Sequence, residues 1–387
     1  MKKVIKRILI GLLAIFFVVS FFFFVKEFTG IGTIKEKDNP KAEANKKPSK
    51  KEYKLSMIMA GDALYHPGVY ADGKKADGTY NYDAQLADIA PIVKKYDLAY
   101  YNQESILGGT ALGLSGYPTF NSPQEVGDAF IKAGFNLVSL ANNHTLDKGT
   151  TGVLNSTTYW SKQKNVMTAG SYLSADAKAN HQHIGEKNGI KYAFFSYTTT
   201  TNGIKVPTGK DYVVDVYSEE KAKADIEAVK DKVDVIFVAM HWGTEYVFKP
   251  TTEQQEIASY LSSLGVNVVI GAHPHVVQPI EHIGDTVVIY SLGNFISAQV
   301  GTERRVGLMA SLNITKTVEN DQTTVAIGDV AGDLVYTYHT SNMKDFKIIP
   351  FYALNNNILP NYQSIKEKYE AIVGGNDDTV TVGAMGA

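Results

Sequence analysis

The chain contains no cysteine. Disulfide bonds, thiolate nucleophiles, iron–sulfur clusters and cysteine-based zinc sites are therefore excluded. The chain also has no excess of positive charge. Its 387 residues include 38 Lys and Arg and 40 Asp and Glu, which gives a formal net charge of -2. A nucleic-acid partner requires a basic face, so we expect none. Charged residues make up only 20% of the chain and apolar residues 44%, which excludes global disorder.

The charge is unevenly distributed along the chain. Residues 1–54 contain 13 Lys or Arg and 5 Asp or Glu, a net charge of +8. The remaining residues contain 25 and 35 of these, a net charge of -10. A basic segment joined to an acidic body indicates that the basic segment meets an anionic surface.

Residues 1–25 predict a transmembrane signal anchor. Four basic residues within positions 2–7 precede Ile8–Val25, a run of 18 residues that is apolar apart from Ser20. As a helix this run would span about 27 Å, close to the thickness of a bilayer core. No small-residue cleavage site follows Phe24, so we expect an uncleaved anchor, with a cleaved signal peptide as the alternative. Positive residues stay on the inside, which predicts a single-pass protein of the cell membrane with its body outside the cytoplasm.

Residues 26–54 are rich in lysine and predict a polar linker, whose lysines either only tether the body or also contact anionic headgroups. From residue 55 onward, short apolar runs alternate with amphipathic helical patterns, which predicts an α/β fold. The predicted strands are Leu55–Gly61, Asp97–Asn102, Phe135–Ala141, Ile190–Tyr197, Val233–Met240, Val266–Gly271 and Thr286–Leu292. The predicted helices are Asp83–Tyr96, Pro123–Gly134 and Ser218–Val233. A fourth predicted helix begins at a capping box formed by Thr252 and Gln255 and ends at Gly265. Residues 301–387 predict antiparallel strands that complete the domain, with a frayed tail from Gly374.

Carboxylate, amide and imidazole side chains follow the ends of these strands. They are Asp62, His66, Glu104, Asn143, His144, Asp147, His241, His273, His275 and Asn294. In α/β sheets, sites form at the carboxyl ends of strands, so we expect these side chains to meet. Each histidine alone is as well explained as a structural residue, and the remaining four histidines lack this setting. Oxygen and imidazole ligands without sulfur suit Mn, Fe or Zn, and their number favours two divalent ions that share a carboxylate.

Seven segments carry a family resemblance. They are GDALYH (61–66), NQES (102–105), YPTFNSP (117–123), SLANNHTLDKG (139–149), HWGTEY (241–246), GAHPHVVQPIE (271–281) and YSLGNF (290–295). In this order they resemble the CapA/PgsA capsule-synthesis family, whose domain is similar to a calcineurin-like metallophosphoesterase. The resemblance implies a sandwich of two β-sheets flanked by helices over residues 55–300, which 301–387 complete.

The resemblance also implies roles for individual residues. The implied metal ligands are Asp62, His66, Glu104, Asn143, His241, His273 and His275. In related enzymes a histidine stands two residues after the first aspartate, where this chain has Leu64, so this ligand is either lost or replaced by His66. His144 would protonate a leaving group and Asp147 would orient it, although Asp147 also suits a helix cap. Trp242, Tyr246 and Asn294 are the implied substrate-binding residues, with packing under a loop as the alternative for the two aromatics.

Three functions are compatible with these residues. The resemblance implies a membrane-anchored component of poly-γ-glutamate or related capsule synthesis and export, working with membrane-embedded synthetase or export subunits on an anionic polymer. The alternative is a metal-dependent phosphoesterase that acts on a phosphorylated cell-surface substrate. The third is a non-catalytic scaffold that binds the polymer. The acidic body disfavours simple polyanion binding unless metal ions or a local basic patch offset its charge.

Overall fold

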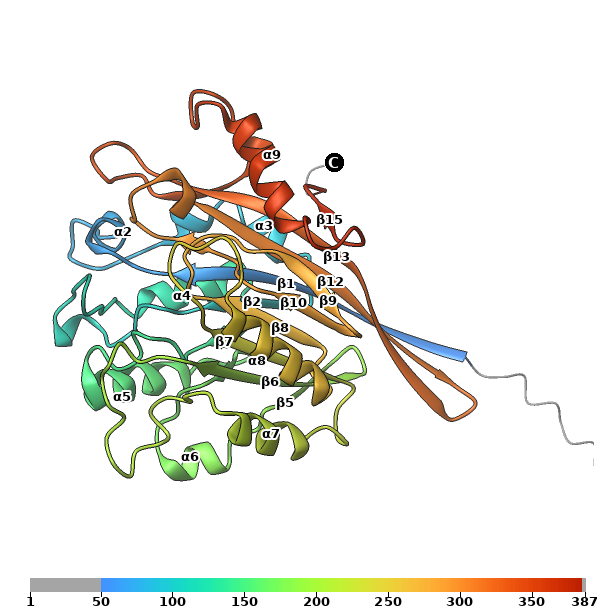
Figure 1. Cartoon of the computed structure of the whole chain (residues 1–387). Helices are drawn as coiled ribbons and strands as arrows, with labels where there is room; N and C mark the ends of the chain where they lie inside the picture. The colour runs from blue at the N-terminus through green and yellow to red at the C-terminus, as the bar shows by residue number, and fades with distance from the viewer. Residues whose placement is uncertain (1–49, 385–387) are drawn as a thin grey trace, which may run out of the picture. The chain divides into compact units, whose positions relative to one another are not determined.

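The computed structural model of the chain describes residues 50–384, in which two β-sheets pack face to face (Figure 1). The first sheet contains, in spatial order, β14 (Lys347–Pro350), β13 (Gln322–Tyr338), β12 (Val306–Glu319), β1 (Lys50–Ala63), β2 (Leu98–Asn102), β3 (Leu137–Ser139) and β4 (Met167–Ala169), with β11 (Asn294–Ile296) on β1 and β15 (Thr381–Val382) on β13. The second sheet contains β5 (Ile184–Lys187), β6 (Ile190–Thr198), β7 (Val235–His241), β8 (Val268–Ala272), β10 (Thr286–Ile289) and β9 (Ile280–Ile283).

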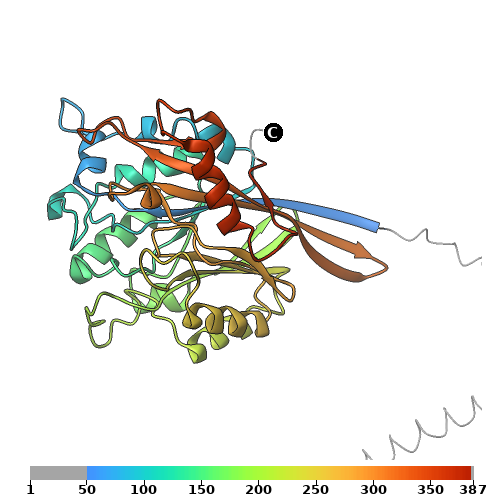
Figure 2. The same ribbon diagram turned by 45° about the horizontal axis from the view of Figure 1, so that its top comes forward.

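Most of the helices cover the outer faces of the two sheets (Figure 2). They are α2 (Pro67–Asp72), α3 (Ala90–Val93), α4 (Glu125–Ala133), α5 (Gly149–Trp160), α6 (Ala175–Ala179), α7 (Glu219–Glu227), α8 (Thr252–Ser263) and α9 (Tyr362–Val373), with short 3₁₀ turns at Asp83–Leu86, Thr110–Leu112, Thr302–Arg304 and Phe351–Ala353. The chain folds this way because successive side chains of a strand point to opposite faces. In β1, Met57 and Met59 pack between the sheets with Phe194 of β6, whereas Ile58 and Ala60 pack on the opposite face of the sheet.

The predicted α/β fold with two sheets flanked by helices is confirmed. Strand β1 begins at Lys50, five residues before the expected start of the domain, and pairs antiparallel with β12 from Lys50 opposite Glu319 onward. The predicted transmembrane span at 8–25 and the linker residues 26–49 lie outside the described residues. Among residues 50–384, no helix has both the length and the apolar character that a membrane crossing requires.

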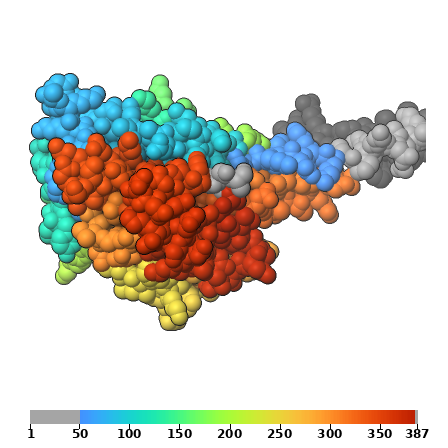
Figure 3. All heavy atoms as spheres, turned by 90° about the horizontal axis from the view of Figure 1, so that it is seen from above, coloured from blue at the N-terminus to red at the C-terminus, as the bar shows by residue number. Residues whose placement is uncertain are grey.

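The C-terminal region completes the first sheet, as expected, through antiparallel β12, β13 and β14. The expected fraying from Gly374 is wrong for the described residues, because β15 pairs with β13 and Asp377 lies 2.6 Å from Nδ1 of His282. Figure 3 shows this segment, coloured red, on one face of the molecule beside the orange strands. Helix α9 was not predicted, and it buries Tyr369 and Val373 against the core between the sheets.

Candidate metal centre

The carboxyl ends of five strands meet at one edge of the sandwich. In the first sheet β1, β2 and β3 run parallel, and in the second β7 and β8 run parallel. Asp62 is the last residue but one of β1, Glu104 follows β2, His241 ends β7, and His273 and His275 follow β8. All five side chains are buried, with exposed fractions of 0–7%. The predicted convergence of these residues on one edge therefore holds in the structure.

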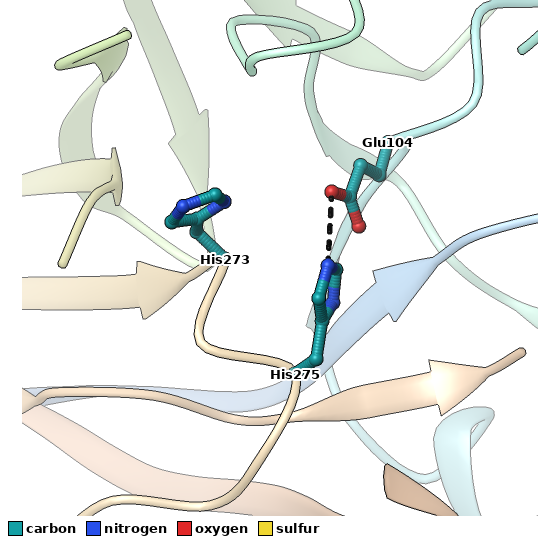
Figure 4. A group of neighbouring side chains, drawn as sticks. All are labelled: Glu104, His273 and His275. Carbon is teal, nitrogen blue, oxygen red and sulfur yellow. Dashed lines mark ion pairs between the residues drawn. The ribbon is translucent and has the colours of Figure 1, made fainter. Parts of the chain in front are cut away.

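Glu104 lies next to histidines of this group, and Figure 4 shows its carboxylate with His273 and His275. Its Oε1 atom is 3.6 Å from Nε2 of His241 and 3.7 Å from Nε2 of His275. One ligand atom each from Glu104, His273 and His275 lie within 4.8 Å of one another, a spacing at which a single ion could contact all three. We call these three residues the Glu104 cluster.

Unpartnered polar atoms in the Glu104 cluster fit a cation. Both carboxylate oxygens of Glu104 and Nδ1 of His273 are buried without a hydrogen-bond partner among the described residues. Buried polar groups are nearly always paired, and such exceptions call for an ion or another ligand. A carboxylate with imidazoles and no sulfur is a donor set that divalent transition metals accept. The identity and number of ions stay a prediction.

Burial and charge shift the pKa values of this group in opposite directions. Burial raises the pKa of Glu104 well above its ordinary range, although the charge of His275 opposes this shift. Burial lowers the pKa of His275, but Glu104 and Asp62 outweigh it and raise the pKa to about 9. Burial, assisted by neighbouring His275, lowers the pKa of His273 to about 4. Burying an unpaired carboxylate costs free energy. A cation beside Glu104 would therefore stabilise its charged form.

Asp62 positions the histidines of the cluster. Its Oδ2 atom lies 3.2 Å from Nδ1 of His275 and accepts a hydrogen bond from the backbone N–H of His273 at 3.3 Å. Nδ1 of His275 also lies 3.0 Å from Oδ1 of Asn294. These contacts hold Nδ1 and leave Nε2 directed at Glu104. Carboxylate and amide partners of this kind fix the ring orientation of metal-binding histidines.

His241 is held by two amides. Its Nε2 atom lies 2.9 Å from Oδ1 of Asn143, and its Nδ1 atom lies 3.3 Å from Nδ2 of Asn102. The same Nδ2 atom donates to Oδ1 of Asp62 at 2.8 Å. Burial, followed by the charges of the neighbouring histidines, lowers the pKa of His241 well below its ordinary value, which favours the neutral ring that a metal ion needs. Asn102 was not among the predicted site residues, although its position at the end of β2 was the available signal.

The loop that carries the two cluster histidines has an unusual backbone. His273 and His275 have φ values of 98° and 57°, a region that residues other than glycine rarely adopt. Just before them, a Cβ atom on Gly271 would lie 1.9 Å from the backbone oxygen of Tyr290. Conformations of this kind cost free energy and persist only where the surrounding structure enforces them, as at ligand sites.

His144 and Asp147 lie beside the cluster as a pair. Nδ1 of His144 is 2.7 Å from Oδ2 of Asp147, and both side chains are almost fully buried. Asn143, the residue before His144, contacts His241 of the group. The structure thus brings the two predicted catalytic residues together next to the predicted metal ligands, and their catalytic roles stay a prediction.

The structure also locates three further predicted residues. Trp242 is wholly buried, and its indole N–H donates to the backbone oxygen of Tyr290 at 2.9 Å, so it packs in the core and does not line a groove. The Nδ1 atom of His66 lies 3.1 Å from the backbone oxygen of Leu64, and the role of His66 as a metal ligand stays a prediction. Burial lowers the pKa of His66 to about 4. Tyr246, by contrast, is 39% exposed and lies over His275 with the ring centres 6.0 Å apart.

Comparison with known proteins gives a family match. The model of the family described as "Bacterial capsule synthesis protein PGA_cap" matches residues 56–299. The PGA biosynthesis protein CapA of Bacillus subtilis (strain 168) is 30% identical over 192 residues, which cover 47% of this chain and 48% of that protein. The capsule biosynthesis protein CapA of Bacillus anthracis is 26% identical over 264 residues, which cover 65% of this chain and 62% of that protein. The matches thus span less than two thirds of either relative.

Solved structures give weaker likenesses. The calcineurin-like phosphoesterase YfkN from Bacillus subtilis has a TM-score of 0.40 and 16% identity, covering 73% of this chain and 91% of that chain. The protein TT1561 of Thermus thermophilus has a TM-score of 0.37 and 10% identity, covering 70% of this chain and 98% of that chain. Neither likeness bears on function.

Proposed function

Because the chain belongs to the bacterial capsule synthesis protein PGA_cap family, we propose that it acts in the synthesis or export of poly-γ-glutamate or a related capsule polymer. The observation that carries this proposal is the match over residues 56–299, which contains every residue of the candidate site. The names of the two relatives, one in PGA biosynthesis and one in capsule biosynthesis, support the same process.

We place this activity at the outer side of a cell membrane. The proposal rests on the basic start of the sequence and on the apolar run Ile8–Val25. In this proposal, residues 55–300 form the catalytic or ligand-binding domain, which residues 301–387 complete. The partners of the protein are membrane-embedded synthetase or export subunits. The ligand is the growing anionic polymer.

The site supports a hydrolytic step within that process. Glu104, His273 and His275 would hold a divalent ion, and His241 with Asn143 would hold a second one that shares Glu104. A bound divalent ion supplies Lewis-acid polarisation and a hydroxide nucleophile near neutral pH. Asp62 keeps the cluster histidines oriented, and the paired His144 delivers a proton to the leaving group.

Two other functions fit the same residues. A phosphoesterase of the cell surface would use the same donor set on a phosphorylated substrate, and the buried Glu104 cluster with the adjacent His144 favours it. A non-catalytic polymer-binding scaffold would need neither ions nor His144. Metal content separates the two enzymes from the scaffold.

The first experiment measures metal in the purified full-length chain. We expect about two Mn, Fe or Zn ions per chain. Glu104→Gln, which keeps the shape of the side chain and removes its charge, should lower that content with little change in melting temperature. His282→Gln is the matched control, because the partly exposed His282 pairs with Asp377 and with no residue of the cluster. A wild-type chain that takes up neither Mn²⁺ nor Zn²⁺ leaves only the scaffold.

The second experiment tests the process itself. Deleting the gene in the organism that carries it should reduce surface polymer, and the wild-type chain should restore it. If Glu104→Gln also restores the polymer fully, the site has no part in capsule synthesis. If deletion leaves the polymer unchanged while the purified protein holds metal, the phosphoesterase function is favoured.

A further inference from the structure

We propose that Arg304 and Tyr246 form an anion-binding subsite beside the Glu104 cluster, which holds a carboxylate or phosphate group of the ligand. This inference rests on the proposed function for the identity of the ligand, but the subsite itself is defined by its own contacts. Arg304 lies beyond residues 56–299, where the family model matches.

Tyr246 is fixed against the loop of the cluster histidines. Its backbone N–H donates to the backbone oxygen of Pro274 at 2.7 Å, and its ring centre lies 6.0 Å from that of His275. The side-chain amide of Gln299 donates to its hydroxyl oxygen at 3.3 Å. Its φ of 65° is one that a tyrosine adopts only where neighbouring contacts impose it. The ring is thus held in place next to the cluster although it is partly exposed.

Arg304 stacks on this ring. The centre of its guanidinium group lies 4.1 Å from the ring centre of Tyr246. Its backbone oxygen accepts a hydrogen bond at 2.8 Å from Asn294, whose Oδ1 atom lies 3.0 Å from Nδ1 of His275. Arg304 is therefore connected to the cluster twice, through the aromatic ring and through the amide.

One donor of the guanidinium group, the buried Nε atom, is left without a hydrogen-bond partner among the described residues. The nearest carboxylate oxygen, on Glu303, is 3.7 Å from Nε, which exceeds hydrogen-bonding distance, and the Glu303 side chain is 38% exposed. A partly exposed pair at this distance contributes little, so an anion can compete with Glu303 for the guanidinium group.

The chemistry of this pair points to an anion. A guanidinium group is a planar fork of N–H donors that matches carboxylate and phosphate oxygens, and stacking on an aromatic ring fixes its orientation beforehand. The residues after 54 carry a net charge of -10, so an anionic ligand needs local positive charge where it approaches. Arg304 supplies that charge beside the cluster, where the reacting bond of the ligand would lie.

The neighbouring Arg305 provides a matched control. It also stacks on a tyrosine, with its guanidinium 4.5 Å from the ring centre of Tyr336. Its Nε atom, however, donates to the backbone oxygen of Thr337 at 2.8 Å, between β12 and β13. Arg305 thus uses its donors within the fold, and its replacement should lower stability without a specific effect on anion binding.

The test measures binding to the full-length chain by calorimetry with two probes, an oligo-γ-glutamate peptide and inorganic phosphate. We expect Arg304→Gln to weaken binding of one probe by about 10- to 100-fold, with metal content and melting temperature unchanged. Arg304→Lys, which keeps the charge but loses the fork, should fall between Arg304→Gln and the wild type. The probe that responds identifies the ligand group as a carboxylate or a phosphate.

Separate outcomes distinguish the subsite from the proposed function. Equal binding by wild type and Arg304→Gln, or no binding of either probe to the wild type, overturns the subsite. An equal loss in Arg305→Gln at an unchanged melting temperature also overturns it, since a general charge effect then explains the result. In a further outcome, the wild-type chain holds no metal and deletion of its gene leaves the capsule unchanged, while Arg304→Gln still weakens probe binding. This combination overturns the proposed function and leaves the subsite standing.

Discussion

One carboxylate oxygen of Asp147 lies 2.7 Å from Nδ1 of His144. The same oxygen accepts a hydrogen bond from the backbone N–H of Phe120 at 2.6 Å, and the ring of Phe120 packs against that of His144 with centres 4.6 Å apart. Asp147 therefore orients the imidazole through Nδ1, which leaves Nε2 as the atom available for proton transfer. No side chain caps the start of α5, so the alternative helix-capping role of Asp147 is wrong.

His144→Ala should keep the fold and the metal while the rate of hydrolysis falls by roughly 10²–10⁴-fold, because a general acid is lost. His144→Asn should behave similarly, since an amide cannot deliver a proton. The measurements are melting temperature, metal content and hydrolysis of a generic phosphodiester. Full activity in His144→Ala would exclude the acid role, and joint loss of stability and metal would make His144 a structural residue.

Gly271→Ala should destabilise the fold, because the new Cβ atom would lie 1.9 Å from the backbone oxygen of Tyr290. Overpacking of this kind typically costs about 1–3 kcal/mol. Gly328→Ala is the matched control, as no atom lies within 4 Å of its Cβ position. Urea unfolding of both variants checks the prediction. Equal urea midpoints for the two variants would show that the backbone at Gly271 and Tyr290 can move apart without a cost in stability.

The stability of the fold should fall as the pH drops from about 6.5 towards 4, and His181 should contribute to this fall. Burial, followed by the charge of neighbouring His183, lowers the pKa of His181 to about 4, although Asp215 opposes the shift. The unfolded chain then binds a proton that the folded chain does not, so stability rises with pH in this window. His181→Phe, which keeps a ring beside Tyr172, should flatten the dependence of melting temperature on pH. Parallel curves for the two proteins would contradict this assignment.

A reporter enzyme that is active only outside the cytoplasm, fused after Ser49, should be active in intact cells. The reason is the basic start of the sequence, which stays inside while Ile8–Val25 crosses the bilayer. Replacing the four basic residues of positions 2–7 by glutamine provides a control, because the orientation signal is then lost. Activity of a cytoplasmic reporter at the same position would disprove the proposed location.

The parallel strands and their end residues were predictable because burial on both faces leaves an unbroken apolar run. Strand β7 shows this, since all seven of its residues are buried and it ends at His241. Helix α5 was missed because its glycines and threonines are weak helix formers, and packing of Tyr159 and Trp160 overrides that preference. The capping box was placed one residue too late, since Thr251 and Gln254 form it and the neighbouring Thr252 and Gln255 offer the same pattern.

The site was predictable as a set of residues but not as an arrangement. Strand-end positions indicated that Asp62, Glu104 and His275 would meet, whereas the distances that distinguish a ligand from a supporting residue depend on loop conformation. The positive φ values of His273 and His275 could not be read from residue types. Arg304 was missed for a similar reason, because it stacks on Tyr246 across 58 residues of chain.

Strand β1 has a mechanical consequence. It pairs with antiparallel β12 from Lys50 opposite Glu319 to Ala60 opposite Met309, and Asp62 of the candidate site stands two residues further on. Hydrogen bonds between strands lie perpendicular to the strand axis, so a pull on Lys50 along that axis loads all of them together in shear. A slip of one residue would also turn Met57 and Met59 out of the core, which opposes sliding. A pull on Lys50 would therefore be resisted by the whole β1–β12 pairing at once, and the geometry of Asp62 would be preserved under tension.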